Sequence, residues 1–292
     1  MFSVILAMLR PLYIGVMGGP KAGKTHLAGT LFTSKHVAAE RVLYLDNHGS
    51  TDAFDFPQYS AKTPWGVKHI SPDDPEELYN FLLELRRTRF VKKQYPYDAI
   101  VLDDWSEFAQ ADIEERLGDE PDAKTLQNWG THGRIMRAAA RLLLPAVSHA
   151  HHIAIFQAAQ MPDPLEARPQ RVEGGQVKFT SDTRKTRIRP FLQGSFASWL
   201  PYKLDGVFYQ YMEVNAERFK FYLQLVPTDK VAVLSRWLHH WVAQPRLARK
   251  LENPTFDALY ALLDRMRGVE GVEGIEPVAQ LNELEEEISG GN

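Results

Sequence analysis

Eight residues near the start of the chain have the types and spacing of a phosphate-binding loop. Residues 18–25 read Gly-Gly-Pro-Lys-Ala-Gly-Lys-Thr and fit the pattern G-x-x-x-x-G-K-[ST]. In such a loop the backbone N–H groups surround a phosphate, the lysine reaches the β- and γ-phosphate oxygens, and the final hydroxyl binds Mg²⁺. We therefore expect Lys24 to be catalytic and Thr25 to bind the metal. The nucleotide would be held by Gly18, Gly19, Pro20, Lys21, Ala22, Gly23, Lys24 and Thr25.

Two aspartates follow a second apolar run. Residues 99–102 read Ala-Ile-Val-Leu, and Asp103 and Asp104 come next. An acidic residue at the end of a buried strand completes the metal site of P-loop enzymes, so we expect Asp103 to hold Mg²⁺. Asp104 is a candidate for orienting the attacking water. Aspartate is also a good N-cap, and capping of a helix over residues 105–117 would equally explain Asp104.

His48 is a candidate for contact with the γ-phosphate. It follows the apolar run of residues 41–45, within residues 46–49, which read Asp-Asn-His-Gly. A neutral imidazole there would hydrogen-bond a water, whereas a loop histidine that caps a turn is the simpler alternative. The D-x-x-G spacing also occurs in GTPases. The sequence contains no N-K-x-D element for reading guanine, so we expect no GTP specificity.

Two glutamines stand at or just past the end of a predicted fourth strand, residues 153–156. In a parallel sheet with a nucleotide at its carboxyl edge, this position faces the γ-phosphate. We prefer Gln160 to Gln157 as the phosphate sensor, because Gln160 begins a segment rich in proline and charge. A polar strand end without a function is the alternative.

Residues 161–190 form that segment and are predicted to be a long mobile loop or hairpin. They carry seven basic and four acidic residues, with Phe179 inside the segment and Phe191 just after it. Basic groups with nearby aromatic rings suit single-stranded DNA, since cations track phosphates and rings stack on bases. A solvated hairpin and an arginine finger reaching a neighbour's nucleotide are the alternatives. The predicted DNA-binding residues are Arg184, Lys185, Arg187 and Arg189.

Three histidines, His149, His151 and His152, precede the fourth strand. Their spacing would suit a metal, but no acidic residue lies close by in the sequence. We therefore interpret them as a solvent-facing cluster at the end of a helix.

Short apolar strands alternate with helices along the first half of the chain, which predicts an α/β fold with a parallel sheet covered on both faces. An antiparallel pair of strands, residues 207–214 and 219–226, is expected later, followed by a helix over 255–266. We divide the chain into an ATPase core (1–244), a C-terminal helix (245–267) and a flexible acidic tail (268–292). The other predicted strands are 12–17, 41–45 and 99–102, and the predicted helices are 25–32, 75–90 and 128–149, with Pro145 kinking or ending the last.

The composition excludes several classes of protein. The chain has no cysteine, so disulfides and thiolate chemistry are excluded. Net charge is −3, yet residues 1–267 carry +4, because the seven acidic residues after Arg267 are all Glu. The apolar run of residues 2–9 is too short to span a bilayer. We expect a soluble cytoplasmic protein without a membrane partner.

These motifs together resemble the RecA-like P-loop proteins of phages, the AAA-type group that includes Sak-type single-strand annealing ATPases. The resemblance covers about residues 12–240. Besides the loop, it rests on residues 45–46, 100–107, 129–130, Gln160, Gly194, 203–207, 227–230 and 235–236.

The resemblance implies ATP and Mg²⁺ as ligands, single-stranded DNA as partner, and a role in phage recombination or replication inside the bacterial host. It also implies a homo-oligomer, ring or filament, with nucleotide between subunits. Lys230 and Arg236 match the basic positions that contact a neighbour's γ-phosphate. Members of the group often carry Glu two residues after the aspartate that ends the second strand. His48 stands there, which implies slow hydrolysis or a substitute base, Asp104.

Other functions share the P-loop. A small-molecule or polynucleotide kinase would use residues 184–189 as an arginine lid. A nucleotide-binding regulator without turnover is compatible with His48. A DNA-packaging motor would need an additional nuclease domain, for which the chain has no room. The acidic tail is a candidate binding segment for a replication or recombination protein.

Overall fold

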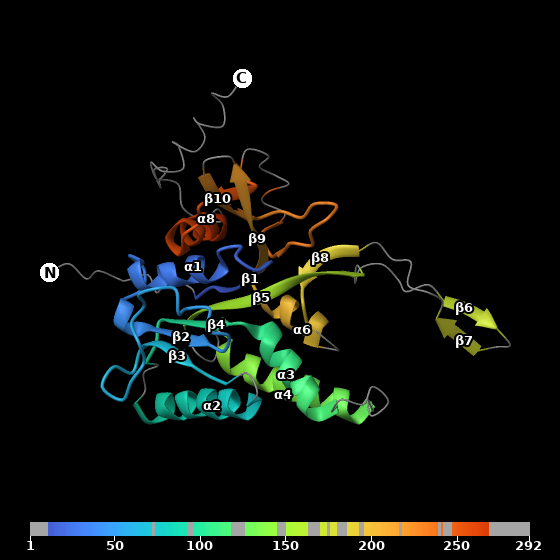
Figure 1. Cartoon of the computed structure of the whole chain (residues 1–292), viewed down its shortest axis with the longest axis horizontal. Coiled ribbons are helices and arrows are strands. Elements are labelled where there is room, and N and C mark those ends of the chain that lie inside the picture. Colours follow the sequence, from blue (N-terminus) through green and yellow to red (C-terminus); the bar gives the residue numbers. More distant parts are fainter. Residues whose placement is uncertain are drawn as a thin grey trace, which may run out of the picture.

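The computed structural model describes residues 11–71, 74–92, 96–117, 126–144, 150–162, 170–173, 176–179, 186–192, 196–215, 218–238, 241 and 247–268. Strands and helices alternate through its first half (Figure 1). In chain order the elements are β1 (Tyr13–Gly18), α1 (Lys24–Gly29), the 3-10 helices η1 (Thr30–Thr33) and η2 (Ala39–Arg41), β2 (Val42–Asp46), β3 (Gly66–His69), α2 (Pro75–Lys92), β4 (Ala99–Asp103), α3 (Trp105–Leu117), α4 (Leu126–Leu143), β5 (His151–Pro162), β6 (Gln170–Glu173), β7 (Gln176–Phe179), β8 (Thr186–Pro190), α6 (Phe196–Lys203), β9 (Gly206–Asn215), β10 (Arg218–Gln224), β11 (Leu234–Ser235), β12 (Lys250–Glu252) and α8 (Phe256–Gly268).

One large sheet forms the centre of the molecule, with strand order β12-β10-β9-β1-β5-β4-β2-β3. The six strands from β9 to β3 are parallel to one another. Every residue of β1, β2 and β4 is buried, which explains why these strands read as unbroken apolar runs. Because parallel strands end at the same edge, the residues that follow β1, β2 and β4 meet there.

Helices cover both faces of the sheet. In Figure 1, α1 and α8 lie beside β1, β9 and β10, and α2, α3, α4 and α6 lie lower in the view, below β5. Helix α4 contacts α2, α3 and α6. Helix α8 docks on η1, where the Phe256 N–H donates to Oγ1 of Thr30 at 2.8 Å and the Ser34 hydroxyl donates to Asp257 at 2.5 Å. The predicted α/β architecture, a mainly parallel sheet flanked by helices with a C-terminal antiparallel hairpin, is confirmed.

The C-terminal hairpin consists of β9 and β10, paired antiparallel from Arg218↔Asn215 to Gln224↔Tyr209. Strand β12 adds to its outer side, so the sheet continues beyond residue 244, where we placed the end of the core. Strand β9 also pairs with β1. The hairpin is therefore tied directly to the strand that precedes the phosphate-binding loop.

Strand β5 is much longer than predicted. It continues from the predicted residues 153–156 to Pro162, and its second half pairs antiparallel with β8. The sequence did not predict this extension. The residues after Phe156 are less apolar, and the partner strand β8 lies far along the chain. Helix α4 ends at Leu143, ahead of Pro145. Arg184, Lys185 and the tail of residues 269–292 lie outside the described residues.

Candidate nucleotide site

The predicted phosphate-binding loop connects β1 to α1. Gly23 is the N-cap of α1 and has φ = 87°, a conformation that side chains rarely adopt. A Cβ at Gly18 would lie 2.4 Å from the backbone oxygen of Gln210, so only glycine fits there. Lys21 has φ = 59°. Two of the glycines in the motif are therefore required by the geometry of this loop.

Lys24 is held over the beginning of the loop. Its Nζ donates hydrogen bonds of 3.0 Å to the carbonyl oxygens of Gly18 and Gly19. Burial lowers the pKa of Lys24, and the negative charges of Asp103 and Asp104 oppose this shift. The lysine thus lies between the loop and the two predicted aspartates.

One carboxylate oxygen of Asp103 accepts hydrogen bonds from three hydroxyl groups. Thr25, Tyr44 and Ser50 donate to Oδ2 at 2.8, 2.7 and 2.7 Å. Burial raises the pKa of Asp103, and these three hydrogen bonds counteract the shift. Tyr44 and Ser50 belong to β2 and the loop after it, so they complete a site that the sequence predicted only from Thr25 and Asp103.

The predicted metal ligands fit Mg²⁺. Oγ1 of Thr25 and Oδ2 of Asp103 are 2.8 Å apart, and neighbouring ligands of an octahedral Mg²⁺ lie about 3 Å apart. Both are hard oxygen donors, and Mg²⁺ is usually held by one or two such side chains together with substrate phosphates and water. In the part of the chain that the structure describes, no group of three His, Asp or Glu residues forms a separate metal site.

Asp104 caps helix α3, because its Oδ1 accepts the Glu107 N–H at 2.7 Å. The Asn47 side chain hydrogen-bonds to both backbone groups of Asp104. Oδ1 of Asn47 accepts the Asp104 N–H at 2.6 Å, and Nδ2 donates to the Asp104 carbonyl at 3.0 Å. Burial raises the pKa of Asp104 to about 7; the hydrogen bond from the Glu107 N–H and the charge of Lys24 oppose this shift, and the charges of Asp103 and Glu107 add to it. Capping is thus observed, and a pKa near neutrality also suits a proton acceptor.

His48 is exposed and lies in a turn that is capped by the Asp46 carboxylate. Oδ1 of Asp46 accepts the N–H groups of His48 and Ser50 at 3.0 and 3.3 Å, and Oδ2 accepts the Thr51 N–H at 2.9 Å as well as the Thr51 hydroxyl. Burial alone would raise the pKa of Asp46, but the hydrogen bonds from Thr51, His48 and Ser50 hold it below its ordinary value. Asp46 therefore shapes the loop that carries Ser50 to Asp103.

The two glutamines lie at different places along β5. Gln157 pairs in register with Gly18, at the start of the loop. Its N–H donates to the Ser106 hydroxyl at 3.0 Å, and its side-chain amide donates to Glu107. Gln160 is exposed and pairs with Ile188 of β8. The geometry brings Gln157 closer to the loop, and a sensor role for Gln160 stays a prediction.

Two of the predicted DNA-binding residues, Arg187 and Arg189, lie on β8. Arg187 and Arg189 are alternate residues of β8, paired with Met161 and Ala159 of β5. Arg236 forms an ion pair of 3.2 Å with Asp205, whose other oxygen accepts the Tyr13 N–H at the beginning of β1.

Lys230 is exposed, and its carbonyl accepts the Ile188 N–H at 2.7 Å. The structure thus places Lys230 beside β8, whereas Arg236 lies at the end of β1 opposite the loop. Neither placement tests their predicted contact with a neighbour's nucleotide.

His151 and His152 are buried in β5, so the expectation of a solvent-facing cluster is wrong for both. Nδ1 of His151 accepts the Leu12 N–H at 3.0 Å, and the His152 ring packs against Tyr13 with ring centroids 4.7 Å apart. The pairing of β5 with β1 and β4 carries these histidines into the core. His149 lies outside the described residues.

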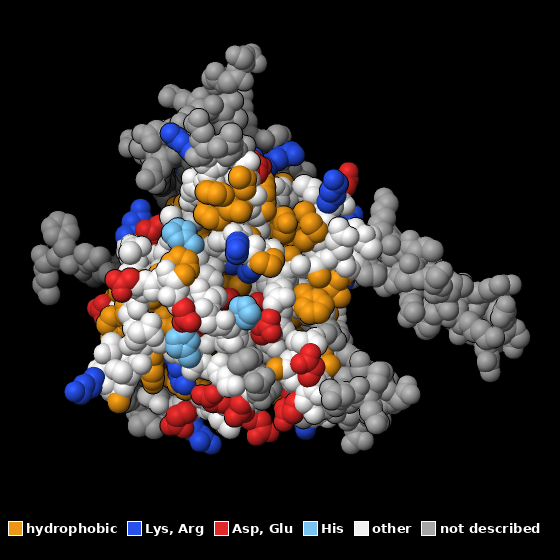
Figure 2. All heavy atoms as spheres, in the orientation of Figure 1, with side chains coloured by type: hydrophobic (Ala, Val, Ile, Leu, Met, Phe, Trp, Pro, Cys, Tyr) orange, Lys and Arg blue, Asp and Glu red, His pale blue; other side chains and the backbone are white. Residues whose placement is uncertain are grey.

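A cavity of about 420 Å³ adjoins the loop. It is lined by Lys21, Ala22, Gly23, Lys24, Thr25, His26, Ser50, Phe54 and Phe221. The sequence did not single out the three ring side chains, because Phe54 and Phe221 come from segments that only the folded sheet brings to α1. Figure 2 shows hydrophobic side chains gathered over the β9–β10 region of this face.

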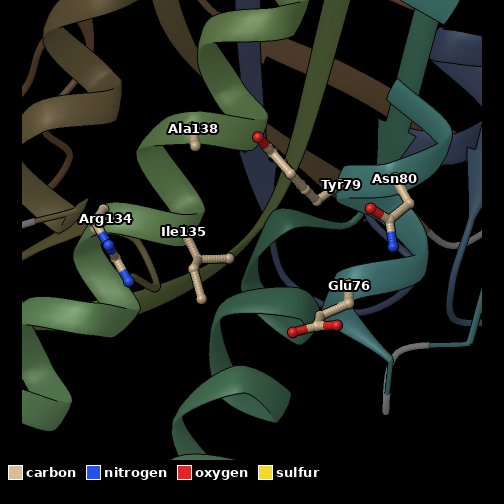
Figure 3. A pocket seen from close by; sticks show the side chains of 6 residues that line it. All are labelled: Glu76, Tyr79, Asn80, Arg134, Ile135 and Ala138. Atoms are coloured by element: carbon tan, nitrogen blue, oxygen red, sulfur yellow. The ribbon is translucent and has the colours of Figure 1, made fainter. Parts of the chain in front are cut away.

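A second cavity, of about 410 Å³, lies between α2 and α4 (Figure 3). Glu76, Tyr79 and Asn80 of α2 face Arg134, Ile135 and Ala138 of α4 across it. None of its lining residues belongs to the phosphate-binding loop or to the aspartate pair. The candidate nucleotide site is therefore the cavity beside α1.

No family model matches the sequence, and a search of curated proteins finds no significant match. Among solved structures, a KaiC-like protein from the hyperthermophilic archaeon Pyrococcus horikoshii is similar at 12% identity and a TM-score of 0.35, over 72% of this chain and 76% of that one. Of the described helices, none is long and apolar enough to cross a membrane.

Proposed function

We propose that this protein binds and hydrolyses ATP and binds single-stranded DNA in phage recombination or replication. The proposal of nucleotide binding rests mainly on one observation. Oγ1 of Thr25 in the loop lies 2.8 Å from Oδ2 of Asp103 at the end of β4, and Lys24 is fixed beside them. Mg²⁺ bound there would neutralise charge on the phosphates. In phosphoryl transfer to water, positioning and charge stabilisation supply most of the catalysis.

Within this site Lys24 supplies a fixed positive charge, and Thr25 and Asp103 supply oxygen ligands. Asp104 is our proposed acceptor for the proton of the attacking water. Its carboxyl group is buried, it interacts electrostatically with Lys24, and its cap on α3 fixes its orientation. His48, by contrast, is exposed on the turn.

The DNA part is supported by the path of β5. Its first half pairs with β1, and Gln157 lies beside Gly18. Its second half, including Gln160, pairs with the basic strand β8. One continuous strand therefore links the nucleotide edge to Arg187 and Arg189, and nucleotide binding at one end would bias the basic segment at the other.

We further propose a homo-oligomer, either a ring or a filament. Arg236 is at the end of β1 opposite the loop, so a contact between Arg236 and nucleotide has to be made on another subunit. Lys230 would contribute to the same contact between subunits.

The test is the ATPase rate with and without single-stranded DNA. We expect a rate that rises when DNA is added, and no turnover in Lys24→Ala. Transfer of phosphate to a small-molecule or polynucleotide acceptor would indicate a kinase instead. ATP binding without any turnover would indicate a nucleotide-binding regulator.

A further inference from the structure

Three ring side chains line the cavity next to the phosphate-binding loop. His26 is the residue after Thr25, and its ring centroid lies 6.2 Å from that of Phe54 and 6.5 Å from that of Phe221. The rings of His26 and Phe221 are stacked, with 27° between their planes. Rings from α1, from the loop after β2 and from β10 thus line one cavity together with residues of the phosphate-binding loop.

The position of these rings matches the nucleoside part of the ligand. In the proposed function Lys24 and Thr25 bind the terminal phosphates and the metal, and the nucleoside would extend from them into the cavity that they line. Of the remaining lining residues, those with large flat surfaces are His26, Phe54 and Phe221. A volume of about 420 Å³ lies within the range of small-molecule sites.

Phe221 is held firmly in place. Its N–H donates to Oδ1 of Asn253 at 3.2 Å, its carbonyl accepts the Asn253 N–H at 2.6 Å, and across the hairpin it pairs with Met212. A Cβ on Gly23 would lie 2.8 Å from the Phe221 ring. The ring therefore touches the loop itself at the N-cap of α1.

A second side chain from the hairpin approaches the same glycine. Nε2 of Gln210 lies 3.0 Å from the position of a Cβ on Gly23. Gln210 is 1% exposed, and within the described structure its Oε1 has no hydrogen-bond partner. Gln210 is not among the residues that line the cavity, so this amide packs against the loop and does not read the base.

We propose that His26, Phe54 and Phe221 form a nucleobase-stacking subsite that accepts adenine and guanine with similar affinity. The proposal rests on the proposed function, since it requires a triphosphate on the loop. Stacking is available to every base because every base has a π-face. Strong discrimination needs side chains that hydrogen-bond one base and are left unpaired by the other. Among the described residues that line the cavity, none is a carboxylate that could read the N–H groups of guanine.

The experiment measures the affinities of ATP, GTP and inorganic tripolyphosphate, each with Mg²⁺, for the full chain and its variants. Phe221→Leu keeps an apolar side chain against Gly23 but removes the ring. His26→Ala changes an exposed side chain and should not affect folding. Phe219→Ala is the matched control, because Phe219 lies two residues earlier on β10, is 67% exposed and does not line the cavity.

We expect ATP and GTP to bind the wild type within about threefold of each other. Phe221→Leu should weaken both roughly tenfold and leave tripolyphosphate unchanged, with a smaller loss for His26→Ala and none for Phe219→Ala. Unchanged ATP affinity in Phe221→Leu, or a preference of about thirtyfold or more for one purine, would overturn the subsite. If tripolyphosphate and ATP both fail to bind the wild type, the proposed function fails as well. If tripolyphosphate binds in a Lys24-dependent manner, only the subsite is in question.

Discussion

Oγ1 of Thr25 donates a 2.8 Å hydrogen bond to Oδ2 of Asp103, although 78 positions separate the two residues in sequence. The contact exists because β1 and β4 are both parallel neighbours of β5 and end at the same edge of the sheet. Tyr44 and Ser50 join it from the β2 side. The relationship turns two separate sequence motifs into one oxygen-rich site beside Lys24.

Asp103→Asn should abolish Mg²⁺-dependent ATP hydrolysis while the chain stays folded. The amide keeps an oxygen that can accept from the hydroxyl groups but loses the charge that attracts the cation. We expect the rate to fall on the order of 10²-fold or more. Asp98→Asn is the matched control, since Asp98 lies just before the other end of β4 in a partly exposed ion pair with Arg41. Equal losses in the two variants would argue against a metal role for Asp103.

Replacing Arg187 and Arg189 by Ala should weaken single-stranded DNA binding and reduce its salt dependence by roughly 0.7 in slope for each phosphate that these residues neutralise. The measurement is DNA affinity across a salt series. Arg86→Ala with Arg87→Ala removes the same charge from α2 and serves as control. Unchanged DNA binding together with a loss of ATPase in the assembled protein would favour the arginine-finger role instead. The same series can include Arg184→Ala and Lys185→Ala.

His152 should make the fold sensitive to acid. Burial lowers its pKa to about 3, against the hydrogen bond of Nδ1 with the Ile100 carbonyl. The folded pKa lies below the unfolded value of about 6.5. The unfolded chain therefore takes up a proton first, and stability is lost as the pH falls from 6.5 towards 3. Between pH 6.5 and 5 the free energy of unfolding should fall by about 1.6 kcal/mol.

Denaturant titrations of the wild type and His152→Leu at several pH values measure this contribution. The variant should show a shallower fall with acid, whereas His48→Leu, which changes an exposed side chain, should follow the wild type. Identical pH slopes in the wild type and His152→Leu would contradict the assignment.

Removing residues 268–292 should tighten single-stranded DNA binding at low salt. The removed segment carries seven Glu, while residues 1–267 carry +4, so the tail competes with DNA for basic residues at high effective concentration. Screening weakens this competition as salt rises. Affinities that coincide at every salt concentration would leave a solubilising tail or a protein-binding tail, with Leu281, Leu284 and Ile288 at helical spacing.

The edge of the sheet that carries the candidate nucleotide site could be predicted, because its sequence patterns are local. The P-loop pattern, the apolar runs of β1, β2 and β4, and the aspartates that follow them are all read from short windows. The rest of the site depends on pairing across the sheet. Ser50 reaches Asp103 through the turn capped by Asp46, and Phe221 reaches Gly23 because β9 pairs with β1. No local pattern marks either residue.

Other misses have the same origin. Strand β3 has only four residues and is defined by its pairing with β2. Helix α6 is short and contains Pro201, a residue that argues against a helix in any local reading. The burial of His151 and His152 follows from the length of β5, which the apolar run of residues 153–156 did not reveal.

The most direct test of the account is an ATP titration of the wild type and Lys24→Ala in Mg²⁺. Lys24 donates hydrogen bonds to two carbonyl oxygens of the loop. Its charge also interacts with the carboxylates of Asp103 and Asp104. The account predicts saturable ATP binding in the wild type, loss of most of that affinity in the variant, and turnover reduced on the order of 10²-fold or more. ATP affinity and turnover that are the same in both proteins would contradict it.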